Sequence, residues 1–294
     1  MSRISHNCRT VRNKLSSSEI WGAGIISTDS SNQRVLNVLQ ITDTHLHADT
    51  EGTLLGLNTY QSLRLVTAEA LSSHVPDLVL ATGDLVHDGS PAAYRLIKSH
   101  LKELGVPVYC LAGNHDEAQS LRKTLPGGLV RYSDHAFSGN WQFIFLDSTI
   151  PGSEAGHLRE EQLELLEAHL SKAPDQHTLV CMHHQPVPVG SEWLDTMAVD
   201  NPGDFFTIID RHPQVRGILW GHVHQEYERQ RNNVRLMASP STCIQFKPLS
   251  SRFAVDECPP GYRWLRLHPD GRIETGIRRI QEIPVGVEVS SCGY

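Results

Sequence analysis

The sequence predicts a mixed α/β fold, in which helices cover β-sheets and antiparallel strands are added towards the end of the chain. From residue 35 onward, short apolar runs alternate with amphipathic stretches, and this alternation is typical of sheets covered by helices. The last third has strand-like runs with no helical pattern between them. Two of these runs flank Asp270-Gly271, a dipeptide that strongly favours a hairpin turn.

Strands are expected where apolar residues run together over a short length. The segment 77–82 is predicted to be a buried strand from its length and composition. Asp270-Gly271 separates the last two runs, which predicts that they pair as a hairpin. In chain order, the expected strands are 35–41, 77–82, 106–112, 141–147, 178–182, 215–220, 233–239, 262–267 and 272–280.

Helices are expected where the apolar residues recur at helical spacing. In 58–73 the recurring residues are Leu63, Val66, Ala70 and Leu71. Ser90-Pro91 is typical of an N-cap followed by a first-turn proline, and it predicts a helix towards residue 104. A third helix is expected over 158–170, with leucines 163, 166 and 170 on one face.

Composition limits the class of protein. With 294 residues, 39% hydrophobic and 20% charged, the chain can bury a substantial core. Its formal net charge of −7 disfavours binding along a nucleic-acid backbone. There is no apolar run long enough for a membrane span and no secretory signal pattern. We therefore expect a cytoplasmic protein without nucleic-acid or membrane partners, although the N-terminus also suits a transit peptide.

Three regions are expected along the chain. Residues 1–34 are polar and aperiodic, and we predict a flexible N-terminal extension there. Residues 35–280 form the folded domain, and residues 281–294 form a C-terminal tail. The six cysteines include no C-x-x-C pair, so neither a zinc ribbon nor a redox motif is expected. Cys110 and Cys181 lie in apolar strand-like runs, which favours buried free thiols there, and we expect a reducing compartment.

The most unusual feature is the set of 17 histidines, several of which lie in short polar motifs directly after predicted strands. Because ligands gather at the carboxyl ends of strands in α/β proteins, these motifs can converge on one site. Carboxylate, imidazole and amide groups together suit Mn, Fe, Zn or Co. The motifs are Asp43-Thr44-His45, Gly83-Asp84, Gly113-Asn114-His115-Asp116, His183-His184 and Gly221-His222-Val223-His224.

Each motif alone also has an ordinary structural explanation. Asp43-Thr44-His45 suits an N-cap followed by a polar turn. Gly113-Asn114 suits a simple turn, because Gly and Asn favour the left-handed conformation. The ordered set of motifs, each behind a strand, favours a metal site over these separate explanations.

In this order the motifs resemble those of the calcineurin-like metallophosphoesterases, over about residues 35–280. Other stretches are similar to the bacterial class III 3′,5′-cyclic-AMP phosphodiesterases of the CpdA type. These stretches are LQITDTHL at 39–46, LGLNT at 55–59, WLD at 193–195 and, most specific, SPSTCIQFKP at 239–248. The resemblance implies a double β-sandwich flanked by helices, which is a four-layer αββα arrangement.

The resemblance also implies a dinuclear centre with two divalent ions, of which Fe²⁺ or Mn²⁺ is expected. One ion would be bound by Asp43, His45 and His224, and the other by Asn114, His183 and His222. Asp84 would bridge both ions. Either His183 or His184 can supply the imidazole, and we choose His183 because it comes first after the strand.

The expected reaction is hydrolysis of 3′,5′-cyclic AMP to 5′-AMP, which would lower intracellular cyclic AMP. Two divalent ions can clamp phosphoryl oxygens and activate water for in-line attack. Asp84 and His115 are the expected catalytic residues, with His115 protonating the leaving oxygen or binding a phosphoryl oxygen. Asp116 is expected to orient His115. The residues expected to contact substrate are His45, Asp84, Asn114, His115 and His224.

Further residues are weaker candidates. His47, Asp49, His87 and Asp88 are more readily explained as neighbouring loop residues than as ligands. The base or ribose is expected to contact residues within the family-like stretches, namely Asn58, Trp193, Thr242, Gln245 and Lys247.

Other functions remain as alternatives. A phosphodiesterase of broad specificity for small diesters is the main one. Protein phosphatases of this kind typically have an Arg soon after Gly-Asp and a Glu after Asn-His, and neither is present around Asp84 or His115. A catalytically inactive scaffold is disfavoured because all the implied ligands are present.

Overall fold

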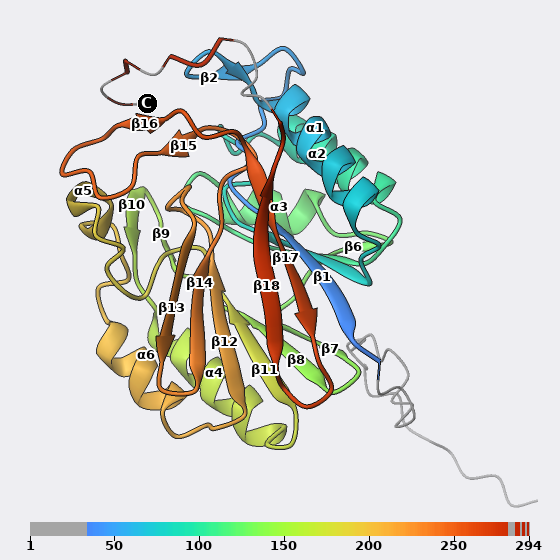
Figure 1. Ribbon diagram of the computed structural model, residues 1–294, viewed down its shortest axis with the longest axis vertical. Coiled ribbons are helices and arrows are strands. Elements are labelled where there is room, and N and C mark those ends of the chain that lie inside the picture. The colour runs from blue at the N-terminus through green and yellow to red at the C-terminus, as the bar shows by residue number, and fades with distance from the viewer. Residues whose placement is uncertain (1–33, 282–285, 289, 292, 294) are drawn as a thin grey trace, which may run out of the picture.

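The computed structural model describes residues 34–281, 286–288, 290–291 and 293. Apart from Arg34, the predicted N-terminal extension lies outside these residues, and part of the predicted C-terminal tail does too. Figure 1 shows two sheets packed face to face, with helices on both outer sides. The prediction of a four-layer αββα sandwich is therefore confirmed.

The first sheet has six strands, and its central strands run parallel. Two antiparallel strands from the end of the chain, β17 and β18, extend it beyond β1. This confirms the hairpin predicted at Asp270-Gly271. The strand order is β18 (Ile273–Arg279), β17 (Gly261–Leu267), β1 (Leu36–Ile41), β4 (Leu78–Thr82), β5 (Val108–Leu111) and β6 (Val130–Tyr132).

The second sheet also has six strands, and antiparallel strands form both of its edges. The late strand β14 pairs with β12 in parallel, whereas its other neighbour β13 is antiparallel. The late strands were predicted to pair in antiparallel fashion, and in this sheet that holds for β13 with β14 but not for β14 with β12. The order is β13 (Tyr227–Arg231), β14 (Val234–Ala238), β12 (Val215–Trp220), β11 (His177–Cys181), β8 (Trp141–Phe145) and β7 (His135–Ser138).

Helices cover the outer faces of the two sheets. Leu63 and Ile97, from α1 (Thr59–Ser73) and α2 (Pro91–Glu103), pack in one apolar cluster with residues of the first sheet. Leu166 and Phe205, from α4 (Glu160–Lys172) and α6 (Pro202–Ile209), pack in another with the second sheet. The remaining helices are α3 (Ala118–Thr124) and α5 (Glu192–Asp195). None of the helices in the described part of the chain is long and apolar enough to cross a membrane.

Three short strand pairs complete the fold. They are β2 (Thr53–Leu54) with β3 (Leu57–Asn58), β9 (Thr149–Ile150) with β10 (Ser153–Gly156), and β15 (Gln245–Phe246) with β16 (Val255–Asp256). Figure 1 shows β10, β15, β16 and α5 on the same side of the molecule.

The core between the sheets is apolar at one end and polar at the other. Val38, Leu80 and Leu219 belong to its apolar part. At the polar end, the buried Gln40 donates from Nε2 to the Thr82 hydroxyl at 2.8 Å and to the Trp220 carbonyl at 3.0 Å. Gln40 therefore links the last residues of β4 and β12, directly before two of the predicted ligand motifs.

Candidate dinuclear metal centre

The predicted ligand motifs converge where strands of the two sheets end. The backbone N–H of Asp43 donates to the Gly83 carbonyl at 3.1 Å, and that of His45 donates to the Asp84 carbonyl at 2.9 Å. The His222 N–H donates to Asp43 Oδ1 at 3.0 Å. Hydrogen bonds thus join loops from β1, β4 and β12, as the position of the motifs after strands predicted.

The backbone of this centre is unusual. Five of its predicted ligands have left-handed backbones, a conformation uncommon for residues other than glycine. Such strain costs about 1–3 kcal/mol per residue, and it clusters at functional sites where the surrounding structure holds it. The residues and their φ angles are Asp43 (55°), His45 (44°), Asp84 (48°), His222 (65°) and His224 (46°).

The side chains form two overlapping groups. In the first, His224 Nε2 lies 3.4 Å from Asp43 Oδ1 and 3.3 Å from His45 Nε2. In the second, His183 Nε2 lies 3.3 Å from Asp84 Oδ2 and 3.1 Å from Asn114 Oδ1. Asp84 Oδ2 is also 3.7 Å from His45 Nε2. Asp84 therefore lies between the groups, where the predicted bridging ligand would lie.

These donors fit divalent ions. Asp43, Asp84 and the ligand imidazoles are buried, whereas Asn114 is half-buried at the edge of the centre. Within the described residues, the Nε2 atom of the buried His222 has no hydrogen-bond partner. A buried polar atom without a partner costs free energy, and a metal ion would remove that cost. Carboxylate, imidazole and amide donors together suit Mn, Fe, Zn or Co.

Backbone carbonyls orient two of the imidazoles. His183 Nδ1 lies 2.9 Å from the Thr82 carbonyl, and His224 Nδ1 lies 2.8 Å from the Ile244 carbonyl. Since a carbonyl only accepts, each Nδ1 donates its proton, and Nε2 is directed at the centre. This outer hydrogen bond is the usual arrangement for a metal-binding histidine.

His183 and His184 differ in their surroundings. His183 contacts Asp84 and Asn114, as described above. Nδ1 of His184 instead lies 2.8 Å from the Ser148 hydroxyl, and its ring centroid is 4.6 Å from that of His222. His184 still belongs to a group with His183 and His222 whose ligand atoms lie within 4.8 Å of one another. The geometry favours His183 as the ligand and places His184 beside it.

The electrostatics of the centre favour cations. Burial opposes ionisation of Asp84, but His183, His115 and His45 hold the pKa of this carboxyl well below its usual range. Burial also lowers the pKa of His183, but Asp84 and Asp43 outweigh it and raise that pKa to about 9. Burial lowers the pKa values of His45 and His222 well below the usual value. His45 and His222 are thus neutral beside the ionised Asp84, the protonation states in which metals bind these groups, whereas an ion bound at His183 Nε2 would displace a proton.

His115 lies at the edge of the centre. Its backbone N–H donates to Asp84 Oδ1 at 2.9 Å. Its ring stacks on that of His87, with centroids 5.1 Å apart, and meets His45 edge-on at 4.8 Å. His47 lies next to His87, with centroids 4.9 Å apart. His47 and His87 thus line the surroundings of His115 and lie outside the predicted ligand set.

The expected role of Asp116 was wrong. Its carboxylate accepts hydrogen bonds from the Gly113 N–H at 2.9 Å, the Leu85 N–H at 3.1 Å and the Tyr94 hydroxyl at 2.9 Å. Burial and the nearby Asp84 raise its pKa to about 7. Asp116 fastens the loop after β5 to the loop after β4 and does not orient the His115 ring.

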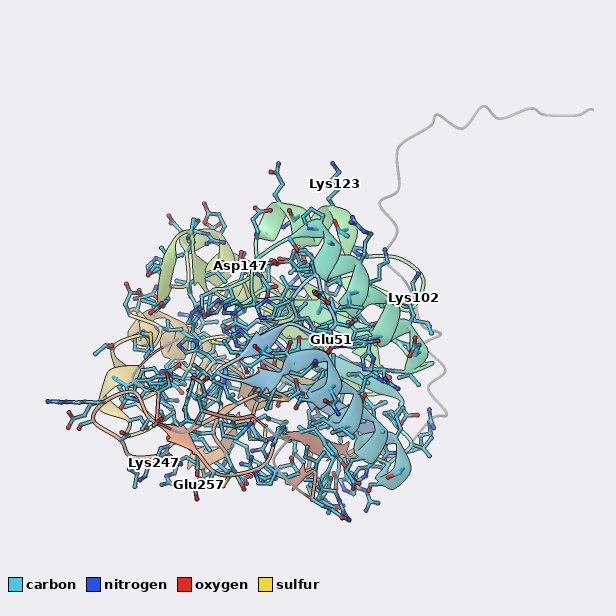
Figure 2. All side chains as sticks on the ribbon, turned by 90° about the horizontal axis from the view of Figure 1, so that it is seen from above. Glu51, Lys102, Lys123, Asp147, Lys247 and Glu257 are labelled. Atoms are coloured by element: carbon cyan, nitrogen blue, oxygen red, sulfur yellow. The ribbon has the colours of Figure 1, made fainter. Side chains whose placement is uncertain are left out.

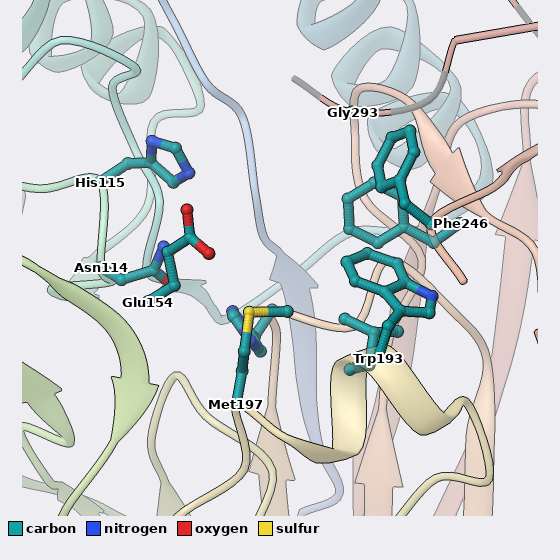
Figure 3. Close-up of a pocket in the computed structure, with 10 residues that line it drawn as sticks. Asn114, His115, Glu154, Trp193, Met197, Phe246 and Gly293 are labelled. Carbon is teal, nitrogen blue, oxygen red and sulfur yellow. The ribbon is translucent and has the colours of Figure 1, made fainter. Parts of the chain in front are cut away.

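A cavity of about 240 Å³ leads from the centre to an aromatic wall. Figure 3 shows Trp193 and Phe246 on one side of it, with Asn114, His115 and Glu154 on the other. The rings of Trp193 and Phe246 meet edge-on at 5.0 Å, and Phe246 stacks on His224 at 4.1 Å. One wall therefore connects an aromatic surface directly to a predicted metal ligand.

Of the residues predicted to hold the base or ribose, only Trp193 lines this cavity. Asn58 caps α1 by accepting from the Gln61 N–H at 2.8 Å. Gln245 donates to the Ser241 carbonyl at 2.8 Å, and thus holds its own loop. Thr242 is buried away from the cavity lining, and Lys247 is exposed at the rim of the molecule (Figure 2). Apart from Trp193, the candidates therefore do not line this cavity, because proximity in a family-like stretch does not fix side-chain direction.

Sequence reasoning missed Glu154, Met197, Phe246 and Phe253 as lining residues. Phe246 lies inside the stretch 239–248 that was singled out, and its aromatic type was an available signal. Glu154 lies on β10, a short irregular strand that has no recognisable pattern. Only the tertiary structure brings it to the cavity.

The chain belongs to the calcineurin-like phosphoesterase family, whose model matches residues 36–226. It is similar in fold to a dimetal phosphatase from Danio rerio, with a TM-score of 0.58 and 16% identity over 84% of this chain and all of that one. A purple acid phosphatase from yellow lupin has a TM-score of 0.61 and 14% identity, covering 86% of this chain and 53% of that one. These likenesses concern the fold alone.

Sequence relatives are more specific. The chain is 43% identical to a Pseudomonas aeruginosa protein named 3′,5′-cyclic adenosine monophosphate phosphodiesterase CpdA, over 91% of this chain and 98% of the relative. It is 41% identical to the Escherichia coli K12 protein of the same name, over 88% of this chain and 95% of the relative. The predicted family is therefore confirmed.

Proposed function

We propose that this protein hydrolyses 3′,5′-cyclic AMP to 5′-AMP at a dinuclear metal centre and thereby lowers intracellular cyclic AMP. The observation that carries the proposal is the cavity that joins the predicted ligands to an aromatic wall. The names and high coverage of the curated relatives support the same substrate. The net charge of −7 agrees with a small-molecule substrate and not with a nucleic acid.

Two divalent ions, Fe²⁺ or Mn²⁺ in our proposal, would be held by residues already described. Asp43, His45 and His224 would hold one, and Asn114, His183 and His222 the other, with Asp84 shared. When bound, such ions supply Lewis acidity and lower the pKa of water. The strained backbones at Asp43 and Asp84 support the ligand assignment, because they aim carboxylates that an ordinary turn would direct elsewhere.

The residues around the phosphate would bind it and supply a proton. Hydrolysis adds water to phosphorus and breaks its bond to O3′, which must then gain a proton. In our proposal His115 would donate that proton, which is supported by its backbone bond to Asp84 and by its position in the cavity lining. His45, Asn114 and His224 complete the phosphate site on the side of the centre.

The aromatic wall would hold the purine. Trp193, Phe246 and Phe253 meet one another edge-on, with centroids 5.0 to 5.5 Å apart. Such contacts fix each ring before a ligand arrives, which lowers the entropic cost of binding. Base stacking on aromatic side chains contributes about 1–3 kcal/mol per base. The wall therefore favours a nucleotide over a diester without a base.

The test is hydrolysis of cyclic AMP by protein reconstituted with Mn²⁺ or Fe²⁺, beside Asp84→Ala. Asp175→Ala is the matched control, because Asp175 is exposed in a loop outside the centre. We expect 5′-AMP from the wild type and from the control, and none above background from Asp84→Ala. Activity on bis(p-nitrophenyl) phosphate without activity on cyclic AMP would instead support a broad diesterase. Inactivity on both substrates with two ions bound would contradict the proposal.

A further inference from the structure

A second group of metal-ligand side chains lies outside the dinuclear centre. Its members are Asp134 and His135, at the start of the edge strand β7, and His169, in the last turn of α4. None of the three belongs to the groups formed by the predicted ligands. The group therefore needs an explanation of its own.

Regular structure holds the group in place. Ala136 belongs to the core between the sheets, so its neighbour His135 points to the opposite face of β7, where α4 packs. The Asp134 carbonyl accepts from the Phe145 N–H at 2.8 Å, which fixes it against β8. The His169 carbonyl accepts from the Gln142 side chain at 3.3 Å. The backbones of Asp134 and His169 are therefore both held in place by hydrogen bonds to the second sheet.

The ligand atoms converge. Asp134 Oδ1 lies 2.8 Å from His135 Nδ1, and Asp134 Oδ2 lies 3.5 Å from His169 Nε2. The two imidazole centroids are only 4.2 Å apart, with an angle of 34° between the ring planes. One ligand atom from each residue lies within 4.8 Å of the others. Bonds of about 2.0–2.2 Å to a shared ion therefore require only small rotations of these side chains.

A metal ion shared by the three side chains explains this arrangement better than hydrogen bonds among them do. If both imidazoles were protonated, two positive charges would lie against a single carboxylate. One divalent ion instead uses all three donors at once. The exposed fractions of 50%, 31% and 15% for Asp134, His135 and His169 leave a path for the ion and for water.

We propose that Asp134, His135 and His169 bind a third divalent cation, separate from the dinuclear centre. Two imidazoles and one carboxylate suit Zn²⁺, Co²⁺ or Ni²⁺, with water completing the coordination. Such an ion would fasten the edge strand β7 to α4. Exposed edges of sheets are liable to pair with other chains, so this bond would also protect that edge.

The test counts Zn²⁺ per chain by equilibrium dialysis and elemental analysis of the full-length protein. We expect three ions in the wild type and two in His169→Ala. His157→Ala is the matched control, because His157 also pairs with a carboxylate, Asp200, at 2.6 Å, and we expect three ions there. Two ions in the wild type, or an equal loss in the control, would overturn the proposal.

A second variant and a second measurement guard against misfolding of His169→Ala. Asp134→Asn keeps the size of the side chain, and we expect it to bind two ions as well. Excess Zn²⁺ should raise the melting temperature of Mn²⁺-loaded wild type by more than that of Asp134→Asn, and an equal rise would contradict the proposal. Cyclic AMP hydrolysis is measured separately, so its failure would not bear on this third site.

Discussion

At the residue scale, His115 is distinguished from the histidines around it by its position. The ligand histidines are buried, whereas His115 is half-buried and lines the cavity. Its backbone N–H donates to Asp84 Oδ1. We therefore expect the ring to act on a bound substrate and not to hold an ion.

His115→Ala tests this separation. We expect turnover of cyclic AMP to fall by about 10²- to 10⁴-fold, the usual contribution of general acid–base catalysis. Bound metal, measured by elemental analysis, should remain at two ions in the centre because the backbone N–H to Asp84 is kept. Loss of metal in the variant would show that His115 supports the centre and not the reaction.

Trp193→Ala tests the aromatic wall. We expect KM for cyclic AMP to rise by roughly 5- to 150-fold, which corresponds to about 1–3 kcal/mol of stacking. Phe246 and Phe253 would remain, so the lower part of this range is expected. Turnover of ribose 3′,5′-cyclic phosphate, which has no base, should change little. An equal loss on both substrates would indicate that Trp193 supports the fold of the site and does not bind the purine.

At the element scale, the sequence predicted the sheet-forming runs and the larger helices closely. The strand expected at 215–220 and the helix expected at 58–73 match β12 and α1 within one residue, because burial enforces an apolar pattern in both. The edge strand β13 was missed. Its sequence, YERQR, is mostly exposed and carries no apolar pattern. Edge strands of this kind are formed by pairing with a neighbour, which local sequence does not record.

The candidate site was predictable to the level of loops. Motifs after buried strands indicated which side chains would meet, because parallel strands bring their carboxyl ends together. The left-handed backbones at Asp43 and Asp84 left no mark in composition. Glu154 and Met197 reach the cavity from segments without a pattern. These backbone conformations and lining residues come together only when the two sheets pack, which local sequence does not reveal.

The loop after β12 depends on a glycine. A Cβ added to Gly221 would lie 2.1 Å from the Thr42 hydroxyl and 2.8 Å from Asp43 Oδ2. We expect Gly221→Ala to displace Asp43, to lower bound metal below two ions per chain and to remove most activity. Gly203→Ala, where an added Cβ meets nothing within 4 Å, should keep both. Full metal content in Gly221→Ala would contradict this account of the loop.

At the scale of the whole molecule, the relative position of the two sheets determines the site, because each sheet supplies ligands. Asp43 and Asp84 follow strands of the first sheet, whereas His183 and His222 follow strands of the second. An apolar interface alone tolerates small shifts between sheets. Directional hydrogen bonds across it, such as the one from Gln40 to the Trp220 carbonyl, do not.

Arg263 is another polar residue that joins the sheets. It lies on β17 of the first sheet and is fully buried. It donates to the Ala238 carbonyl at 2.7 Å and to the Ser239 hydroxyl at 3.2 Å, at the end of β14 in the second sheet. Ser239 in turn donates to Gln40. A continuous chain of hydrogen bonds therefore connects the two sheets directly behind the metal-ligand loops.

Arg263→Met keeps an unbranched, largely apolar side chain but removes the donors. Because buried acceptors then lose their partners at about 1–3 kcal/mol each, we expect the free energy of unfolding to fall by about 2–4 kcal/mol. Arg266→Met on the same strand is the matched control, since Arg266 is exposed and its loss should cost less than about 1 kcal/mol. Urea denaturation of the Mn²⁺-loaded proteins measures both. If the sheets shift without Arg263, the variant should also bind metal more weakly below its unfolding transition, whereas unchanged metal affinity would limit Arg263 to stabilising the fold.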